Sequence, residues 1–321
     1  MILIITNTQD ITADFVVREL HKRKLKFARL NTDEFPVNGF GSYKINYNEG
    51  KTKYIYWKNR ENILDFSDVK SVWYRRPIRP VVGLKSQRKS IKKFCEDESY
   101  EFLRGVWYSL NAFWISDPEA IRKAEHKIFQ LKVAEELSFT LPKTLFSNNS
   151  EEIQNFYSHC NDQVIIKPLY MGFVDDAKSP MWIYTSSLTK KEVQNTKSLN
   201  IIPSIYQEKI EKNFDVRVTV IGDKVFAAKI VAQNLPKNIP DWRYSPIKNL
   251  KHFKYKLPTE IEELCIRLVK KLGLEFGAID FAVDKNNQHV FFEINPNGQW
   301  AWLENILKLP ISSEIVNQLT R

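Results

Sequence analysis

The first part of the chain alternates short apolar runs with an amphipathic stretch. Residues 2–5 are apolar, the segment through Leu20 is amphipathic, and residues 27–30 form a second apolar run. This order predicts a strand, a helix and a strand in a parallel α/β unit, because the helix covers one face of the sheet that the strands form.

Later segments extend this predicted unit. The alternating residues 43–47 and 53–57 flank Asn48-Glu-Gly50 and predict a hairpin. Residues 72–74 form another apolar run, which ends at Arg75-Arg76-Pro77 and precedes a long amphipathic stretch. We therefore expect an N-terminal α/β domain over residues 1–114.

The middle of the chain opens with a helix-start signal. Asp117 precedes a proline and can cap a helix whose apolar stripe continues to Leu131. Residues 164–167 and 181–184 then predict two strands. These elements indicate a small central α+β domain over residues 115–206.

The last third of the chain carries the clearest strand pattern. It predicts a hairpin around Gly222-Asp223, an amphipathic helix and a final pair of strands. The predicted elements are residues 216–221, 224–231, 260–272, 276–283 and 290–295. We place them in a C-terminal α+β domain over residues 207–321.

Composition narrows the classes of function. Of the 321 residues, 43% are hydrophobic and 27% are charged, as in ordinary globular proteins. The three cysteines lie far apart, which argues against a disulfide framework or a zinc site. No secretory signal and no run long enough to span a bilayer is present, so we expect a cytoplasmic protein without a membrane partner.

The net charge of +10 fits an acidic peptide, a polyphosphate or nucleic acid, and it equally fits solvated lysine-rich faces. The most basic segment, residues 85–93, carries no interleaved aromatic platform for bases. Since no zinc finger or recognition helix is evident either, we expect no nucleic-acid partner.

Two carboxylates and an amide form the first candidate site. Glu293 and Asn295 are two positions apart on a predicted strand, so their side chains share a face. Asp280 lies on the preceding antiparallel strand, within reach of that face. Three hard oxygen ligands suit Mg²⁺ bound jointly with phosphate oxygens. Taken alone, these residues also fit an ordinary solvated strand face.

Basic residues upstream fit the same chemistry. Lys167 follows an apolar strand and Lys127 lies on the helix before it, although single lysines are usually surface charges. Arg217, Lys229 and Arg243 add positive charge shortly before the carboxylates. A nucleoside triphosphate needs spaced cations as well as metal, so the set predicts a triphosphate site.

The order of these segments resembles the ATP-grasp superfamily over residues 115–300. The matching segments are Lys127, Val164-Ile-Ile-Lys167, Gln207-Glu-Lys-Ile210, Asp215-Val-Arg217, Gly277-Ala-Ile-Asp280 and Phe292-Glu-Ile-Asn295-Pro-Asn-Gly298. Three further segments resemble the microviridin and graspetide maturases, which macrocyclise ribosomal peptides: Trp73-Tyr-Arg-Arg-Pro77, Asp241-Trp-Arg243 and Asn297-Gly-Gln-Trp300. The glutamate ligases of ribosomal protein S6 are the relatives most easily confused with them.

The resemblance implies an α/β protein of the ATP-grasp fold, with an N-terminal α/β domain, small central and C-terminal α+β domains, and ATP between the last two. The implied ATP contacts are Lys127, Lys167, Gln207, Glu208, Lys209, Ile210 and Asp215. The implied catalytic residues, at the γ-phosphate and acyl phosphate, are Arg217, Lys229 and Arg243. Two Mg²⁺ ions are expected on Asp280, Glu293 and Asn295.

Two features depart from the family pattern. The loop after Lys167 contains one glycine, Gly172, where many ATP-grasp enzymes have several. The register of the Gly222-Asp223 hairpin is also open. A two-residue turn puts Arg217 and Lys229 on opposite faces, whereas a longer bulged loop puts them together.

The resemblance implies a ligase that converts Asp or Glu carboxylates of a ribosomal precursor peptide into acyl phosphates. It then forms intramolecular esters or amides, releasing ADP and phosphate. The implied partner is that peptide with its leader segment, for which Asp175, Asp176 and Trp182 are docking candidates. A homodimer is a further expected assembly. The alternatives are a glutamate–protein ligase and, less favoured, a basic nucleic-acid-binding protein.

Overall fold

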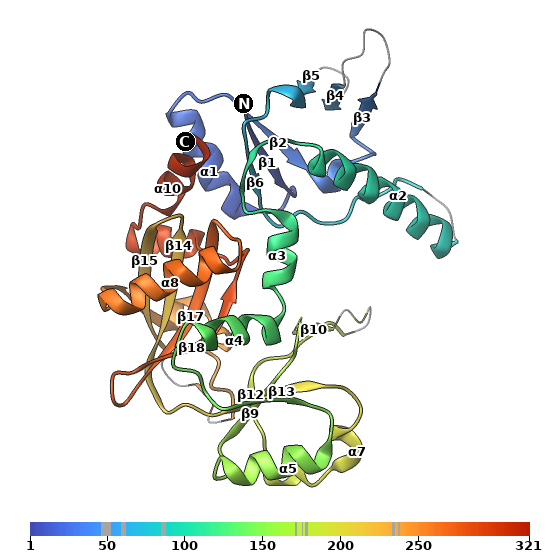
Figure 1. Cartoon of the computed structure of the whole chain (residues 1–321). Helices are drawn as coiled ribbons and strands as arrows, with labels where there is room; N and C mark the ends of the chain where they lie inside the picture. Colours follow the sequence, from blue (N-terminus) through green and yellow to red (C-terminus); the bar gives the residue numbers. More distant parts are fainter. Residues whose placement is uncertain are drawn as a thin grey trace. The chain divides into compact units, whose positions relative to one another are not determined.

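The computed structural model covers residues 1–321. It describes residues 1–45, 53–58, 62–84, 88–170, 172–174, 176, 179–232, 235–236 and 238–321. The chain divides into two compact units (Figure 1). Unit 1 comprises residues 1–118, 299–304 and 310–321, and unit 2 comprises residues 119–298 and 305–309. Within the described ranges, no helix is both long and apolar enough to cross a membrane.

Unit 1 is built on a parallel sheet with the strand order β2-β1-β6-β7. The strands are β1 (Ile2–Thr6), β2 (Phe27–Asn31), β6 (Ser71–Tyr74) and β7 (Phe113–Ile115). Helix α1 (Ile11–Lys22) leads from β1 to β2, and α2 (Lys89–Tyr108) leads from β6 to β7 in the opposite direction along the sheet. Because such crossovers are right-handed, the two helices cover opposite faces. The predicted strand–helix–strand opening is confirmed.

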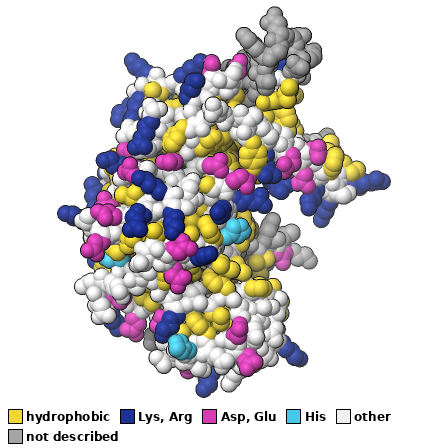
Figure 2. Space-filling model, viewed as in Figure 1, with side chains coloured by type: hydrophobic (Ala, Val, Ile, Leu, Met, Phe, Trp, Pro, Cys, Tyr) yellow, Lys and Arg dark blue, Asp and Glu magenta, His cyan; other side chains and the backbone are white. Residues whose placement is uncertain are grey.

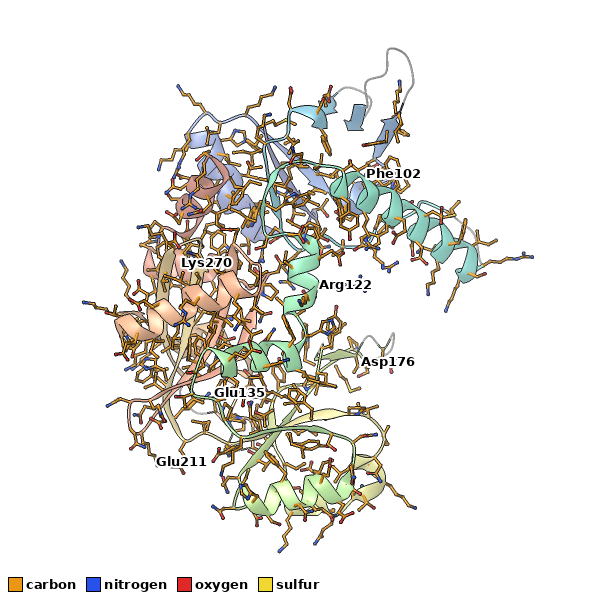
Figure 3. The ribbon with its side chains drawn as sticks, viewed as in Figure 1. Phe102, Arg122, Glu135, Asp176, Glu211 and Lys270 are labelled. Carbon is orange, nitrogen blue, oxygen red and sulfur yellow. The ribbon has the colours of Figure 1, made fainter. Side chains whose placement is uncertain are left out.

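Local chemistry explains how these elements form. The side chain of Asp10 accepts a hydrogen bond from the Thr12 amide at 3.0 Å and so caps α1. Leu3 and Ile5 alternate with residues of the other face and pack in the core with buried side chains of α2. Phe102 of α2 stacks on Phe35 with ring centroids 5.7 Å apart (Figure 3).

A three-stranded antiparallel sheet is inserted between β2 and β6. It comprises β3 (Gly39–Lys44), β4 (Lys53–Lys58) and β5 (Asn62–Asp65). Tyr43 pairs with Tyr54, which confirms the predicted hairpin. The strand β5 was not predicted. The predicted turn Asn48-Glu-Gly50 lies outside the described residues.

The end of the chain returns to unit 1. Helix α10 (Ile311–Leu319) packs beside α1, and α9 (Ala301–Leu307) precedes it. The Ser71 hydroxyl at the start of β6 donates to the Leu319 carbonyl at 2.6 Å, across 248 positions of sequence. No local pattern in the sequence predicts a contact of this range.

Unit 2 contains two larger antiparallel sheets, with the orders β12-β9-β13-β8 and β16-β15-β14-β17-β18. The first comprises β8 (Thr144–Ser147), β9 (Val164–Lys167), β12 (Ser186–Ser187) and β13 (Ser204–Glu208). The second comprises β14 (Lys212–Ile221), β15 (Lys224–Ala232), β16 (Leu250–Tyr255), β17 (Phe276–Asp284) and β18 (His289–Asn295). A separate short hairpin pairs β10 (Phe173–Val174) with β11 (Met181–Trp182). The strands predicted in these regions are confirmed, although β11 is shorter than expected.

The helix predicted to start after Asp117 is two helices, which corrects the single stripe to Leu131. They are α3 (Pro118–Ala124) and α4 (Lys127–Glu136). The Gln130 side chain donates to the Ala124 carbonyl at 2.5 Å and to the Ile294 carbonyl at 2.8 Å, so it caps α3 and ties α4 to β18. The break also changes which side is buried: α4 buries Gln130, Val133 and Ala134, whereas Ile128, which lies within the predicted stripe, is 59% exposed.

The remaining helices of unit 2 flank its sheets. They are α5 (Ser150–His159), α6 (Lys190–Val193), α7 (Thr196–Leu199) and α8 (Thr259–Lys271). The predicted amphipathic helix 260–272 is therefore confirmed as α8, which buries Cys265, Leu268 and Val269. Across the face visible in Figure 2, Lys and Arg side chains are interspersed with Asp and Glu.

Candidate active site

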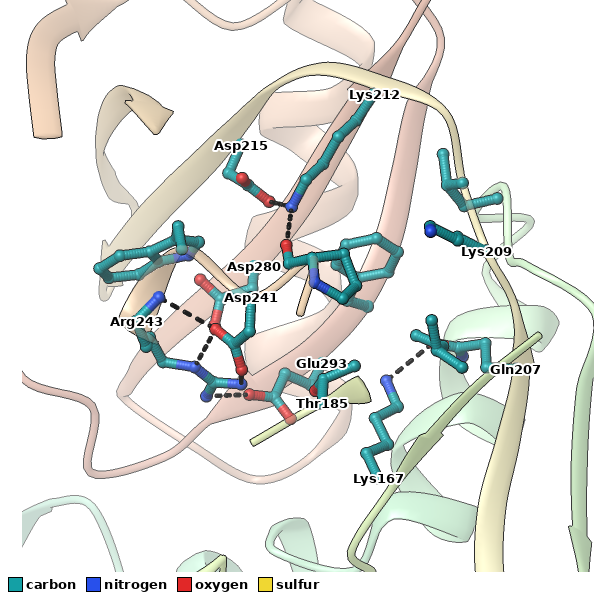
Figure 4. A pocket seen from close by; sticks show the side chains of 15 residues that line it. Lys167, Thr185, Gln207, Lys209, Lys212, Asp215, Asp241, Arg243, Asp280 and Glu293 are labelled. Atoms are coloured by element: carbon teal, nitrogen blue, oxygen red, sulfur yellow. Dashed lines mark hydrogen bonds and ion pairs between the residues drawn. The ribbon is translucent and has the colours of Figure 1, made fainter. Parts of the chain in front are cut away.

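Two adjoining cavities in unit 2 collect most of the predicted site residues. They enclose about 70 Å³ and about 450 Å³. Figure 4 shows the first, lined by side chains from both large sheets. The cavities share five lining residues, Lys167, Thr185, Asp241, Arg243 and Glu293. The charged residues that are far apart in sequence therefore meet here.

Strand register builds the acidic side of the site. Arg217 on β14 pairs with Asp280 on β17, and Asp280 pairs with Glu293 on β18. Directly paired residues share a face, so these three side chains form one row across the sheet. Asn295 follows two positions later, opposite Ala278. The shared face that the sequence predicted for Asp280, Glu293 and Asn295 is the face on which the structure places them.

A β-bulge in β18 allows Glu293 to lie in this row while Phe291 is buried in the core. Phe281 pairs with Phe291 whereas Asp280 pairs with Glu293, so Phe292 is an extra residue in β18. Phe291 is consequently buried on the opposite face from Glu293, although two-residue alternation alone would place them together. Phe292 lines the first cavity, and the Lys167 ammonium lies 5.6 Å from the centroid of its ring. The sequence pattern did not predict this bulge.

Three cations surround Glu293. Lys127 Nζ lies 2.8 Å from Glu293 Oε2, and an Arg243 guanidinium nitrogen lies 3.5 Å from Oε1. Burial alone would raise the pKa of Glu293, but Lys127, Arg243 and Lys167 together hold it well below its usual range. Glu293 is therefore ionised throughout the physiological pH range.

The neighbouring carboxylates have other environments. Burial raises the pKa of Asp280, with the nearby charge of Glu293 adding to the rise and Arg217, which donates to it at 2.8 Å, opposing it. Asp241 accepts two hydrogen bonds from the Arg243 guanidinium, at 2.9 and 2.8 Å (Figure 4). This two-bond contact fixes the plane of the Arg243 guanidinium beside Glu293.

Lys167 is the cation that the four-stranded sheet supplies. Its ammonium donates to Gln207 Oε1 at 2.7 Å, and Gln207 in turn donates to the Thr144 hydroxyl at 2.9 Å. Burial lowers the pKa of Lys167 to about 8, with Glu293 opposing the shift and Lys127 adding to it. A lysine held at this pKa can bind an anion strongly near neutral pH, because little water competes for it.

The side chains of residues 207–210 do not all face the first cavity. Gln207, Lys209 and Ile210 line the first cavity. Glu208 does not, and its carboxylate lies 3.9 Å from Lys143 Nζ. Within β13, alternation places Gln207 and Glu208 on opposite faces, whereas Lys209 and Ile210 follow the end of the strand.

Asp215 lines the first cavity and accepts from Lys212 at 2.7 Å. Burial raises the pKa of Asp215 to about 6, and Lys212 opposes that rise. Lys212 also donates to the Pro240 carbonyl at 2.9 Å. Lys212 was not among the residues predicted for the site, and nothing in its local sequence pattern distinguishes it from a surface lysine.

The predicted position of Lys229 in the site is corrected by the register. The turn Gly222-Asp223 has two residues, and Gly222 adopts a φ of +55°. Lys229 therefore pairs with Val216, whereas Arg217 pairs with Ala228. The Lys229 ammonium lies on the other face of the sheet, 3.9 Å from the centroid of the Phe214 ring.

The proposed peptide contacts lie around the short hairpin of β10 and β11. Trp182 is 66% exposed, packs against Phe173 with ring centroids 4.8 Å apart, and lines the second cavity. Asp176 lies beside β10 (Figure 3). Asp175 lies outside the described residues. The single glycine of this loop, Gly172, is required by close packing, because a Cβ there would lie 2.4 Å from the Ile183 carbonyl oxygen.

The oxygen ligands fit magnesium rather than a softer metal. Among the described residues, no group of three or more His, Cys, Asp or Glu side chains is placed to hold a metal ion. Asp280 and Glu293 instead form a pair, with the Asn295 amide on the same face. Mg²⁺ prefers one or two carboxylates completed by water and phosphate oxygens, which matches this set.

Residues 124–319 match the family model described as the RimK-like ATP-grasp domain. The chain belongs to this family. Residues 1–122 match a second model, the MvdD pre-ATP grasp domain. The ATP-grasp fold expected from the sequence is thereby confirmed, and the protein is an ATP-grasp ligase, an enzyme class that uses ATP with Mg²⁺.

Solved structures similar to this one extend over the whole chain. Macrocyclase MdnC of Microcystis aeruginosa MRC, bound with precursor peptide MdnA, is 31% identical with a TM-score of 0.88, and the match covers 100% of this chain and 99% of that one. A RiPP-associated ATP-grasp ligase of Chryseobacterium gregarium, in complex with ADP and a leader and core peptide, is 28% identical with a TM-score of 0.91. That match covers 99% of this chain and 96% of the other. The resemblance to peptide macrocyclases stated from the sequence is confirmed.

A curated relative is more distant. The α-aminoadipate–LysW ligase LysX of Saccharolobus solfataricus is 24% identical over 184 residues. The match covers 56% of this chain and 64% of LysX, so this chain spans less than two thirds of that relative.

Proposed function

We propose that this protein is an ATP-dependent peptide macrocyclase. It activates Asp or Glu side chains of a ribosomal precursor peptide as acyl phosphates and closes them onto a hydroxyl or amine of the same peptide. Support comes from the row of Arg217, Asp280 and Glu293 beside Lys127 and Lys167, in a chain similar over its full length to macrocyclases.

We assign the nucleotide contacts by chemistry. Lys127 and Lys167 hold the phosphates, since both are partly buried ammonium groups beside the carboxylate pair. Gln207, Lys209 and Ile210 line the first cavity and receive the base, together with the backbone of Glu208. Asp215 lies at the ribose. Asp280, Glu293 and Asn295 hold two Mg²⁺ ions, which neutralise charge on the triphosphate.

The reaction follows from this arrangement. A peptide carboxylate oxygen attacks the γ-phosphorus, and the bond from that phosphorus to ADP breaks. A hydroxyl or amine of the peptide then attacks the activated carbonyl carbon, loses its proton and displaces phosphate. Arg217 and Arg243 stabilise the charge on the transferring phosphoryl group, while the cavity positions the reactants.

Recognition of the peptide needs a surface away from this chemistry. We propose that the leader segment docks beside the β10–β11 hairpin, where Trp182 offers an exposed apolar surface and Asp176 a negative charge. Precursor peptides are made on ribosomes, so a cytoplasmic location belongs to the same proposal. A homodimer remains a prediction, and neither a nucleic-acid nor a membrane partner is proposed.

The deciding experiment incubates the purified protein with ATP, Mg²⁺ and the precursor peptide encoded beside its gene, and measures the peptide mass. Loss of one water per new ring, with one ADP formed for each, is the expected result. A gain of one glutamyl unit would identify the alternative glutamate–protein ligase. Unchanged peptide with no ADP would contradict both.

A further inference from the structure

The carboxyl edge of the unit 1 sheet has the topology of a ligand site. In the order β2-β1-β6-β7, the connections through α1 and α2 run in opposite directions from β1 and β6. In open parallel sheets, ligands bind outside the carboxyl ends of the two strands at which the direction changes. Here those two ends lead directly into Asn7 after β1 and into Arg75 and Arg76 after β6.

A buried network holds this edge in place. The Arg75 side chain is 1% exposed, lies 3.3 Å from Asp10 and donates to Gln299 Oε1 at 3.0 Å. Thr12 donates to the same Gln299 oxygen at 2.5 Å. Arg75 and Gln299 come from two of the segments that carried the resemblance to peptide maturases, and both lie within unit 1. Because it is buried and paired with Gln299, Arg75 has a structural role.

Arg76 differs from its neighbour. Its φ is +47°, in the left-handed region that an L-residue with a long side chain rarely adopts. The Asn7 side chain donates to the Arg76 carbonyl at 2.7 Å and also accepts from the Gln9 amide at 2.9 Å, so it braces this conformation. Glycine or asparagine would occupy the position with less strain, which indicates that the arginine side chain itself is used.

The Arg76 guanidinium is available for a ligand. Arg76 is exposed, and within the described part of the chain its side chain forms no hydrogen bond or ion pair. Burial lowers the pKa of Arg75 to about 10, with Asp10 opposing the shift and the adjacent Arg76 charge contributing to it. Two adjacent like charges favour an additional anion.

We propose that Arg76 binds an acidic side chain of the peptide substrate. This inference rests on the proposed function for the nature of the substrate. The planar guanidinium matches a carboxylate with two parallel hydrogen bonds, which explains why an arginine rather than a lysine stands at this strained position.

The test measures binding, so it does not depend on ring formation. The probes are the fluorescently labelled precursor peptide encoded beside the gene and a copy whose Asp and Glu are Asn and Gln. We expect the wild type to bind the acidic probe about tenfold more tightly, as a charge-assisted contact predicts. Arg76→Gly should abolish that preference and melt no lower than the wild type, because glycine tolerates positive φ.

Two further variants sharpen the result. Arg76→Lys should retain part of the preference, since it keeps the charge and loses the planar fork. Arg79→Ala is the matched control: Arg79 is an exposed arginine three positions later, already paired with Asp97, and its loss should leave the preference unchanged.

Three outcomes would overturn the inference: no preference in the wild type, a full preference in Arg76→Gly, or an equal loss in Arg79→Ala. A wild type that forms no rings but shows the Arg76-dependent preference would contradict the proposed function alone. Ring formation with an unchanged preference in Arg76→Gly would contradict the Arg76 inference alone.

Discussion

The two large sheets of unit 2 line one cavity and contribute different charged groups to it. The four-stranded sheet presents Lys167 beside the amide of Gln207, whereas the five-stranded sheet presents Asp280 and Glu293. These groups compensate one another, as the lowered pKa of Glu293 shows.

Neither sheet forms the site alone, because residues of both line the cavity. The lysines without the carboxylates would bind phosphate but no metal ion. The carboxylates without the lysines would bind the metal ion but lack contacts to the phosphates. Each prediction below removes one half of the site, or a group that the register excludes from it.

The largest effect is expected from the acidic sheet. Glu293→Gln keeps the shape of the side chain and removes the charge that three cations share, so turnover should fall by about 10³-fold or more. ADP release at saturating Mg²⁺ measures the loss. Glu262→Gln on the exposed side of α8 is the control, and near-normal turnover in Glu293→Gln would refute the metal assignment.

Removing the main cation of the other sheet should act on nucleotide binding. Lys167→Ala is expected to lower kcat/KM for ATP by about 10²-fold, mainly through a higher KM, because one buried phosphate partner is lost. Steady-state kinetics with varied ATP checks this, with Lys190→Ala on α6 as an exposed lysine control. Equal small effects in both variants would mean that Lys167 is an ordinary charge.

The same lysine predicts a pH dependence. Burial lowers the pKa of Lys167 to about 8, so the ammonium is charged below that pH and neutral above it. The value of kcat/KM for ATP should therefore fall as pH rises through about 8 in the wild type. Lys167→Arg should move this alkaline limb upward, since a guanidinium keeps its proton. An unshifted limb would assign the titration to another group.

The smallest effect is expected at Lys229. Because it lies on the opposite face from Arg217, Lys229→Ala should change turnover less than twofold, whereas Arg217→Ala should nearly stop it. Loss of the contact with Phe214 should cost about 0.5–1 kcal/mol of unfolding free energy, measured by denaturant titration. A turnover loss equal to that of Arg217→Ala would show that the face assignment is incomplete.

Much of the site was predictable because it depends on short-range alternation. Glu293 and Asn295 share a face through a period of two, and β9 ends at Lys167 as its apolar run indicates. The order of the charged segments then matched one superfamily. These features depend on neighbouring positions in the sequence, so they can be predicted without knowing which distant residues come into contact.

Other features depended on registers and partners that a sequence does not display. A two-residue turn placed Lys229 outside the site, and the extra residue Phe292 allowed Phe291 to be buried while Glu293 faces the cavity. Glu208 does not line the first cavity, although Gln207, Lys209 and Ile210 of the same segment do.

The sequence by itself determined the elements, the chemistry of the charged residues and the family to which their order belongs. Only the tertiary structure decided which charges meet, that one predicted helix is two with Gln130 capping the first, and that Arg75 is buried against Gln299 while Arg76 stays exposed. The physical reason is that hydrophobic periodicity encodes which side of an element is buried. The pairing of buried polar groups depends on partners that folding brings together from distant parts of the chain.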